Sequence, residues 1–162
     1  MKSLLIIGYG QYGKVVEELA GICGYEKINA LDDNNPEALD KIDYFEKYVD
    51  QFEDCVVAIG NANIRKELTE KIRPYFNLAT IVHPTAIISP NASVGAGCII
   101  EPYVVIHREA HIGDACIINA AAVINHDSTV GSYSQLCCNS VVPANVSVPE
   151  GSKLGHCERW DG

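Results

Sequence analysis

The chain has few positive charges, and this shortage excludes two classes of partner. Its 162 residues contain 12 Lys and Arg against 21 Asp and Glu, which gives a formal net charge of -9 at pH 7. Nucleic acids and anionic membrane surfaces bind proteins through clustered Lys and Arg, and the sequence contains no basic stripe. We therefore expect no nucleic-acid partner and no membrane partner.

The sequence also lacks long apolar runs and paired metal-ligand motifs. No run approaches the roughly 20 apolar residues that a membrane-spanning helix needs, and Met1 to Gly8 reads as a strand rather than a signal peptide. We therefore expect a cytoplasmic protein. The seven cysteines are an odd number, and we expect no disulfides. The Cys and His residues near the C-terminus show no CxxC or HxxxH spacing, so we expect no metal site.

What the sequence does contain is a period of six residues. Such a period fits neither the 3.6-residue period of an amphipathic helix nor the alternation of a plain strand. It fits a chain that turns a corner every six residues around a dry axis, with three faces closing a coil of eighteen. We therefore predict about four coils of a parallel β-helix rather than the alternative, an ordinary β-sandwich; at about 4.8 Å per strand they stack to about 19 Å. The aliphatic positions are Val82, Ile88, Val94, Ile100, Ile106, Ile112, Ile118, Ile124, Val130, Leu136, Val142, Val148 and Leu154.

Two further positions of the repeat have restricted composition. The position two residues before each aliphatic residue is small or β-branched, as in Cys98 and Cys116, which predicts that it points into a tight corner. Gly95, Gly113 and Gly131 follow their aliphatic residues at intervals of eighteen. We expect these glycines to adopt a backbone conformation that other residues reach only at a cost.

Residues 1–80 lose the period of six and predict a small Rossmann-like α/β lobe. An apolar strand leads through a glycine-rich turn into an amphipathic helix, and two strands and a second helix follow. We expect Glu67 and Lys71 to pair on the second helix, and the first helix to bury Val15, Val16, Leu19 and Cys23. The predicted elements are strands 3–8, 27–31, 55–59 and 78–82, a first helix that stops at Gly24 and a second that ends near Phe76.

The turn after the first strand carries a GxGxxG motif. Gly8, Gly10 and Gly13 open the helix, and the acidic pair Asp32 and Asp33 follows about twenty residues later. Glycines let the backbone approach a phosphate, and the helix N-terminus supplies amide donors with a partial positive charge. The alternative is that the glycines only make a tight turn. Eighty residues are too few for a full dinucleotide fold, so we expect no complete NAD site.

Together, these features resemble the hexapeptide-repeat sugar acyltransferases of the sialic acid O-acetyltransferase and bacillosamine-pathway N-acetyltransferase type. The resemblance covers nearly the whole chain and implies a left-handed parallel β-helix over residues 81–162, preceded by a Rossmann-like sugar-nucleotide-binding lobe over residues 1–80. It also implies a homotrimer. The local matches are ALDD at 30–33, AIGNANIRK at 58–66, IVHPTAIISP at 81–90 and INAAAVINHDSTVG at 118–131.

By this resemblance, the protein moves an acetyl group from acetyl-CoA to an amine or hydroxyl of a sugar, expected to be a UDP-amino sugar. His126 matches the catalytic histidine and Asp127 its acidic neighbour. The repeat register independently places His126 at an outward corner, where a neutral imidazole can take a proton from the attacking group. No cysteine lies beside His126 in the register, which favours direct attack over an acyl-enzyme. The alternative for His126 is a solvated corner residue.

The resemblance also assigns the binding residues. Two positions depart from the family, because Tyr12 and Gln135 stand where relatives often carry histidine. The other class left open is a non-catalytic sugar-nucleotide-binding or scaffold protein with an incomplete acyl-CoA groove, since the sequence stops shortly after Leu154. The implied contacts are Gly8, Gly10, Gln11 and Tyr12 for the diphosphate, Asp32, Asp33, Gly60 and Asn61 for the uridine and ribose, Asn119 for the acceptor, and Ala144 and Gly155 for acetyl-CoA.

Overall fold

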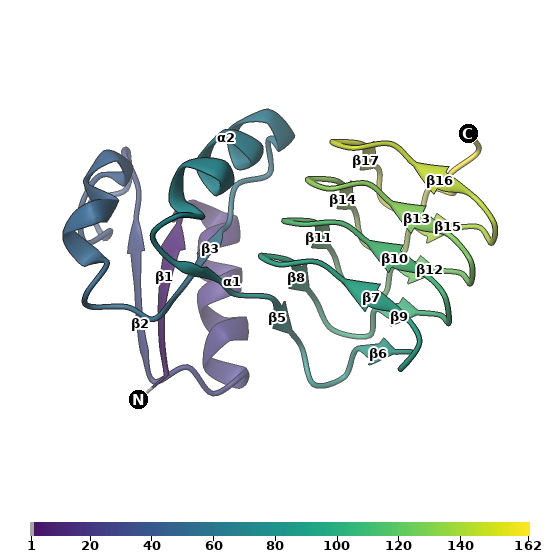
Figure 1. Ribbon diagram of the computed structural model, residues 1–162, viewed down its shortest axis with the longest axis horizontal. Helices are drawn as coiled ribbons and strands as arrows, with labels where there is room; N and C mark the ends of the chain where they lie inside the picture. Colours follow the sequence, from purple (N-terminus) through teal and green to yellow (C-terminus); the bar gives the residue numbers. More distant parts are fainter. Residues whose placement is uncertain (1) are drawn as a thin grey trace.

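The computed structural model describes residues 2–162 and shows a small α/β lobe followed by a stack of parallel coils (Figure 1). In the N-terminal lobe, four parallel strands lie in the order β2-β1-β3-β4. Within the described range, no helix is long and apolar enough to cross a membrane. The elements of the lobe are β1 (Ser3–Ile7), α1 (Gln11–Ile22), β2 (Lys27–Leu31), the 3-10 helix η1 (Ile42–Tyr48), β3 (Asp54–Val57), α2 (Ala62–Ile72) and β4 (Asn77–Leu78).

The sheet of the N-terminal lobe is buried on both faces, which explains why β1 is an unbroken apolar run. One face packs against η1 and α2 around Phe45 and Ile72. The other face packs against α1, and the same core includes Ile99 and Ile117 from the coils. The lobe and the coils therefore share one continuous apolar core along α1.

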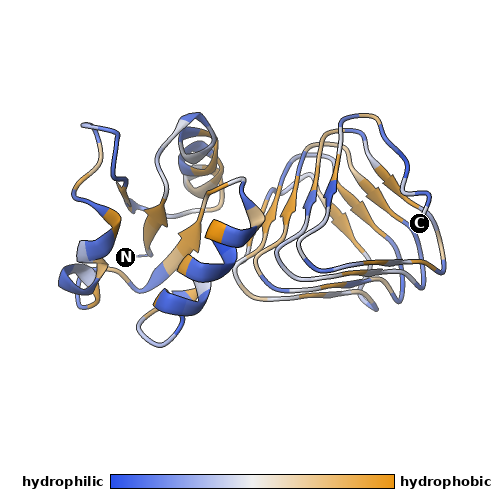
Figure 2. Cartoon of the chain, turned by 90° about the horizontal axis from the view of Figure 1, so that it is seen from above, coloured by the Kyte–Doolittle hydropathy of each residue, from blue (hydrophilic) through white to orange (hydrophobic). Residues whose placement is uncertain are grey.

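The coils form a parallel β-helix of three sheets, with strand orders β16-β13-β10-β7, β17-β14-β11-β8-β5 and β15-β12-β9-β6. Paired residues differ by eighteen, as in His111 and Thr129, so the predicted coil length is confirmed. Figure 2 shows the coils stacked in series, with apolar strands recurring along their faces. The strands are β5 (Ile81–Val82), β6 (Ile87–Ile88), β7 (Ser93–Val94), β8 (Ile99–Ile100), β9 (Val105–Ile106), β10 (His111–Ile112), β11 (Ile117–Ile118), β12 (Val123–Ile124), β13 (Thr129–Val130), β14 (Gln135–Leu136), β15 (Val141–Val142), β16 (Ser147–Val148) and β17 (Lys153–Leu154).

The core of the β-helix contains every aliphatic residue of the predicted register. Ten of them are buried, and the first three, Val82, Ile88 and Val94, are partly buried at the first coil. The small residues two positions earlier also face inward, including Cys98 and Cys116. The predicted register is therefore confirmed. The seven cysteines are free thiols.

The reason for the repeated glycines differs from the prediction. Gly95, Gly113 and Gly131 have no left-handed backbone, but a Cβ on Gly113 would lie 2.5 Å from the backbone nitrogen of Ser132 on the next coil. Close approach between coils, and not conformational freedom, therefore requires glycine. The left-handed conformation occurs instead at the third residue after the aliphatic position, where nine non-glycine residues have φ between 49° and 62°, including Asp127.

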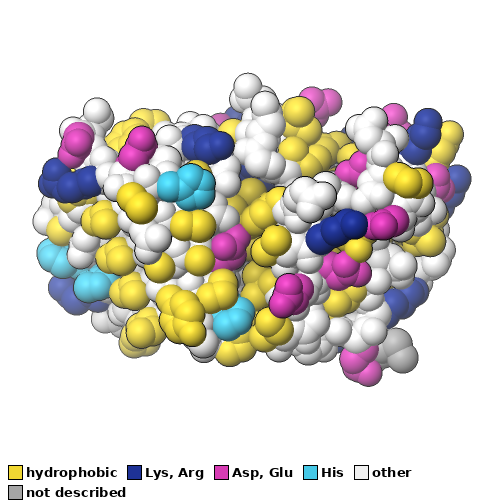
Figure 3. Space-filling view, turned by 180° about the vertical axis from the view of Figure 1, so that it is seen from behind, with side chains coloured by type: hydrophobic (Ala, Val, Ile, Leu, Met, Phe, Trp, Pro, Cys, Tyr) yellow, Lys and Arg dark blue, Asp and Glu magenta, His cyan; other side chains and the backbone are white. Residues whose placement is uncertain are grey.

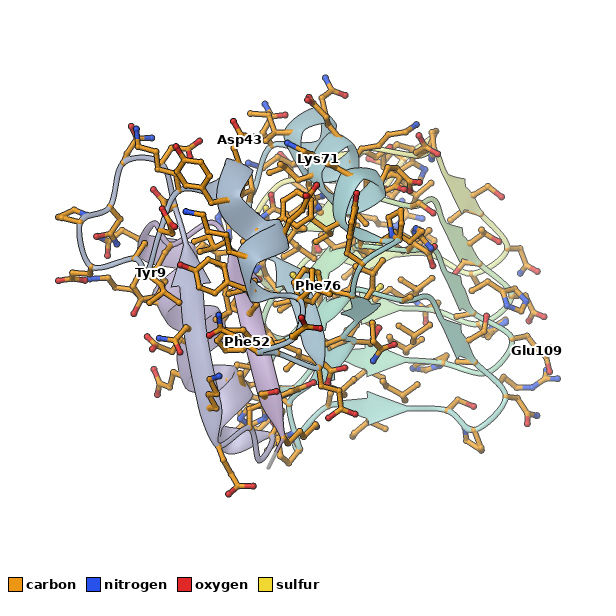
Figure 4. The ribbon with its side chains drawn as sticks, turned by 60° about the vertical axis from the view of Figure 1, so that its left-hand side comes forward. Tyr9, Asp43, Phe52, Lys71, Phe76 and Glu109 are labelled. Carbon is orange, nitrogen blue, oxygen red and sulfur yellow. The ribbon has the colours of Figure 1, made fainter. Side chains whose placement is uncertain are left out.

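Three details of the N-terminal lobe also correct the predictions. The strand expected over 78–82 is divided between two sheets, because β4 pairs with β3 and β5 pairs with β8. Val15 is 47% exposed, and α1 buries Val16, Leu19 and Ala20. Lys71 forms its ion pair with Asp43 of η1 at 2.8 Å (Figure 4), and not with Glu67, because η1 packs beside α2.

Candidate functional site

The glycine-rich turn between β1 and α1 borders an open pocket of about 480 Å³. The turn supplies Gly10, Gln11 and Lys14 to its wall, and the segment after β2 supplies Asp32. No side chain caps the N-terminus of α1, so its first-turn amides remain available to a ligand. The pocket therefore combines free helix amides with one lysine. The other lining residues are Tyr9, Asn34, Asn35, Pro36 and Glu37.

The three motif glycines have different reasons to be glycine. Gly8 has φ +95°, and a Cβ there would lie 2.5 Å from Ile59. A Cβ on Gly13 would lie 2.3 Å from the carbonyl oxygen of Gly8, so this glycine allows α1 to pack close to the turn. A Cβ on Gly10 would meet no atom within 4 Å, and Gly10 lines the pocket. Gly8 and Gly13 therefore serve the tight turn, whereas Gly10 keeps the pocket floor open.

Asp32 organises the pocket wall through backbone amides. Its Oδ2 accepts a hydrogen bond from the Tyr9 amide at 2.7 Å, and its Oδ1 accepts from the amides of Asn34 and Asn35 at 2.8 and 3.0 Å. Burial by itself would raise the pKa of this carboxyl, but the three amide donors outweigh it and the pKa is lowered. Asp32 is therefore a carboxylate at neutral pH, held at the rim next to Gly10.

Three other residues assigned to the nucleotide make contacts within the fold. Asp33 Oδ1 accepts from the Ile42 amide at 3.0 Å and thereby fixes the start of η1. Asn61 caps α2 by accepting from the amides of Asn63 and Ile64. The carbonyl of Gly60 accepts from Arg65 at 2.9 Å. Gly60 and Asn61 therefore follow the carboxyl end of β3 and are not among the residues that line the glycine-turn pocket.

Arg65 links the N-terminal lobe to the coils from a fully buried position. Its guanidinium donates to the carbonyls of Ile59 and Gly60 in the lobe, to that of Ala115 in the β-helix at 2.8 Å, and to that of Tyr133. Burial lowers the pKa of this guanidinium. Four backbone carbonyls therefore hold the end of β3 against the corner of the coils.

Tyr12 points away from the glycine-turn pocket. Its hydroxyl donates to Oε1 of Glu101 at 3.0 Å, and burial, followed by the nearby Glu101 carboxylate, raises the Tyr12 pKa well above its ordinary value. The same Glu101 oxygen accepts from Nδ2 of Asn119 at 2.6 Å, and Asn119 Oδ1 accepts from Nε2 of Gln135 at 3.0 Å. A chain of hydrogen bonds thus joins the start of α1 to three successive coils.

His126 and Asp127 lie on the turn between β12 and β13, at a corner of the coils that faces outward. Their side chains are 47% and 41% exposed, and His126 Nδ1 lies 2.7 Å from Asp127 Oδ2. The left-handed backbone of Asp127, with φ 58°, forms this corner. Because Nδ1 faces the carboxylate, Nε2 is the ring nitrogen that can accept a proton from a bound group.

Asn119 lies at another corner, on the turn between β11 and β12. The two residues assigned to acetyl-CoA are divided between the same two edges of the coils. Ala144 lies eighteen residues after His126, and Gly155 lies thirty-six residues after Asn119. Ala144 lines a pocket with Pro143 and Trp160, and the Gly155 amide donates to Glu158 at 2.8 Å. One chain therefore brings Ala144 next to His126, but it keeps Asn119 and Gly155 along a different edge.

Sequence reasoning missed Lys14, Asn35 and Glu101. Lys14 pairs with Glu37 at 2.5 Å in the pocket wall, and Asn35 donates to the Tyr9 carbonyl at 2.6 Å. Their positions depend on how the segment after β2 folds back, for which the sequence holds no signal. Glu101 did have a signal, because it lies eighteen residues before Asn119 in the repeat register.

The described residues contain no group of three His, Cys, Asp or Glu side chains placed to hold a metal ion. On the face shown in Figure 3, Lys and Arg side chains are scattered among acidic ones and form no basic patch.

Comparisons with known proteins agree with this architecture. Residues 3–72 match the family model described as PglD N-terminal domain. The UDP-N-acetylbacillosamine N-acetyltransferase of Bacillus subtilis (strain 168) is 33% identical over 118 residues, which cover 61% of this chain and 51% of that protein. The chain thus spans about half the length of this curated relative.

Two solved structures extend the comparison to nearly the whole chain. The acetyltransferase domain of PglB from Neisseria gonorrhoeae FA1090, in complex with acetyl coenzyme A, has a TM-score of 0.89 and 30% identity, covering 96% of this chain and 80% of that one. PerB from Caulobacter crescentus, in complex with CoA and GDP-perosamine, has a TM-score of 0.75 and 24% identity, covering 98% and 91%. The second likeness shows the fold alone.

The fold defines a class of protein, the left-handed parallel β-helix proteins with a Rossmann-like N-terminal lobe. Within this class, the chain belongs to the hexapeptide-repeat sugar acyltransferase family that includes PglD and the acetyltransferase domain of PglB. The predicted fold and family are therefore confirmed.

Proposed function

We propose that the protein transfers an acetyl group from acetyl-CoA to the amine of a UDP-linked amino sugar. The observation that carries the proposal is the pair of His126 and Asp127 at an outward corner of a family β-helix, with Ala144 on the next coil of the same edge. The printed activities of the relatives support the substrate class, since one acts as a UDP-N-acetylbacillosamine N-acetyltransferase and one was solved with acetyl coenzyme A.

The side chains at this corner suit direct transfer. Nε2 of His126 accepts a proton as the sugar nitrogen attacks the thioester carbonyl, and Asp127 stabilises the imidazolium through Nδ1. The carbon–sulfur bond then breaks, and the imidazolium returns the proton to the leaving thiolate. Acetyl-CoA supplies the activated acyl group, and the protein supplies the base and the alignment.

We assign the sugar nucleotide to residues 1–80 and the acyl transfer to residues 81–162. Support comes from the glycine-turn pocket, where Gly10, Lys14, the α1 amides and the Asp32 carboxylate offer contacts for a phosphate and for sugar or ribose hydroxyls. We assign the uridine and the diphosphate to the residues predicted from the sequence, except for Tyr12, whose hydroxyl is bonded to Glu101.

We further propose a cytoplasmic homotrimer. The two residues assigned to acetyl-CoA, Ala144 and Gly155, lie along different edges of one chain, so a donor molecule that reaches both needs a second copy to supply one of them. Closed cyclic symmetry would bring the corners together and cover the flat coil faces. Light scattering at micromolar concentration should give three times the chain mass of 17.6 kDa, and a monomer mass would contradict this assembly.

The experiment that tests the proposed function is a thiol-release assay with acetyl-CoA against a panel of UDP-amino sugars and sialic acid. We expect CoA release that depends on one or more UDP-amino sugars. A protein that binds the sugar nucleotide by calorimetry, but releases no thiol with any member of the panel, would instead be a non-catalytic sugar-nucleotide-binding protein.

A further inference from the structure

Glu101 is a buried carboxylate that the proposed reaction does not use. It follows β8 and is 8% exposed. Its Oε1 accepts from the Tyr12 hydroxyl and from Nδ2 of Asn119, and its Oε2 accepts from the Ala120 amide at 3.0 Å. All three donors are uncharged groups, and burying a carboxylate against uncharged donors costs more than burying an amide of the same shape. Packing alone therefore does not explain a charge at this position.

A carboxylate differs from an amide in one property that matters here, since it can only accept hydrogen bonds. Glu101 therefore obliges Asn119 to present Nδ2 to it, which leaves the Asn119 oxygen to accept from Gln135 Nε2. The charge sets one direction for the whole chain of hydrogen bonds. With glutamine at position 101, both Asn119 and Gln135 could reverse their amide groups.

The directed chain ends in an acceptor without a partner. Oε1 of Gln135 is shielded from solvent and has no hydrogen-bond partner among the described residues. A buried acceptor left without a donor is unfavourable, so the site gains when a donor reaches it. Gly60 is a neighbour of this oxygen, because an added Cβ there would lie 3.8 Å from it, an ordinary contact distance. Gly60 belongs to the sugar-nucleotide residues of the proposed function, so the unpartnered oxygen faces the end of β3 where that function places the ligand.

We propose that Glu101 is a positioning residue that fixes the direction of Asn119 and Gln135, so that Gln135 Oε1 receives an N–H or O–H donor of the acceptor sugar. This inference rests on the proposed sugar-nucleotide site. The fixed Gln135 oxygen would favour substrates that carry an amine or hydroxyl donor next to it over substrates that carry only an acceptor there. Glu101 itself touches no substrate and acts through its two neighbours.

The test measures binding by calorimetry with two probes, UDP-N-acetylbacillosamine and UDP. Glu101→Gln should weaken UDP-N-acetylbacillosamine about tenfold, the loss expected for one hydrogen bond, and should leave UDP affinity unchanged. Gln135→Leu should give the same loss, and the double variant should be no weaker than either single variant. Glu109→Gln is the matched control, because the Glu109 carboxylate is exposed at the edge of the coils that lies away from the N-terminal lobe, and this variant should change neither affinity (Figure 4).

Additive losses in the double variant, equal weakening of UDP, or unchanged affinity in both single variants would overturn the inference. Wild-type protein that binds UDP-N-acetylbacillosamine no better than UDP would also overturn it. If Glu101→Gln does not fold, Gln135→Leu decides alone by the same comparison of the two probes. Intact binding without thiol release would refute the proposed transferase activity but would support the positioning role if the variants behave as expected.

Discussion

Gly113→Ala offers a sharp test of how the coils stack. The added Cβ would lie 2.5 Å from both the backbone nitrogen and Oγ of Ser132, and 2.8 Å from its Cα. The two coils would have to move apart by about 0.9 Å to reach the ordinary contact distance of 3.4 Å. Ser132 cannot yield easily, because its neighbours donate to the coils on either side, Gly131 to Val148 and Tyr133 to Asp114, each at 2.8 Å.

Overpacking of this kind costs about 1–3 kcal/mol, and we expect the upper end because the clash is with backbone. For a chain of this size, each kcal/mol corresponds to about 2–4 °C in the unfolding midpoint, so the midpoint should fall by about 6–12 °C. The matched control is Gly21→Ala in α1, where a Cβ meets nothing within 4 Å. Alanine there should add about 0.5–1 kcal/mol of stability.

Thermal unfolding followed by circular dichroism measures both variants under one condition. If the coils stack as closely as the structure shows, Gly113→Ala should lower the unfolding midpoint and Gly21→Ala should raise it. A Gly113→Ala midpoint equal to or above that of wild type would show that the coils are not held as close as the structure has them.

Three other perturbations test separate parts of the structure. Ile124→Asp places an unpaired carboxylate at a fully buried position of the β-helix core and should prevent folding; a wild-type midpoint would contradict the register. Arg65→Met leaves four backbone carbonyls without their donor, and urea unfolding should show a loss of about 3 kcal/mol or more; a loss within error of zero would mean that Arg65 does not hold the lobe to the coils. The folded pKa of Asp32 is lowered, so its contribution to stability is present at pH 7 and is lost as the pH falls from the ordinary value of 3.8 through the folded value. Asp32→Asn should therefore be less stable than wild type at pH 7, with a gap that closes in acid, and a gap that is constant with pH would refute the assigned charge.

The β-helix could be predicted from the sequence because one physical demand recurs at a fixed interval. Every coil must fill the same dry axis, so Ile106, Ile124 and their equivalents repeat without any knowledge of the rest of the chain. The glycine positions were also predictable, but their cause was not. Whether Gly113 needs a left-handed backbone or a close neighbour depends on the coil above it, eighteen residues later.

The N-terminal lobe was harder to predict in detail because its contacts join segments far apart in the sequence. The apolar run of 78–82 has no internal signal for dividing between two sheets, since β3 and β8 decide the division. Likewise, the helical period predicted that Val15 is buried together with Val16 and Leu19. In the structure Val15 is 47% exposed, because the buried face of α1 runs through Val16, Leu19 and Ala20.

The candidate site divides in the same way. The glycine turn and the corner histidine follow from local patterns and could be predicted, because a motif or a register fixes each of them. The path of hydrogen bonds from Tyr12 through Glu101 to Asn119 depends on how the lobe docks on the coils, and Tyr12 was wrongly expected to face the glycine-turn pocket. The roles assigned to His126, Asp127 and the binding residues remain predictions.

The most direct test of the central claim is thiol release by His126→Ala with acetyl-CoA and UDP-N-acetylbacillosamine. We expect turnover to fall by about 100-fold or more, the usual loss for a general base, while the calorimetric affinity for the sugar nucleotide stays at the wild-type value. His107→Ala is the control, since His107 is an exposed histidine at the corner after β9 and should retain full turnover. Wild-type turnover in His126→Ala would contradict the account.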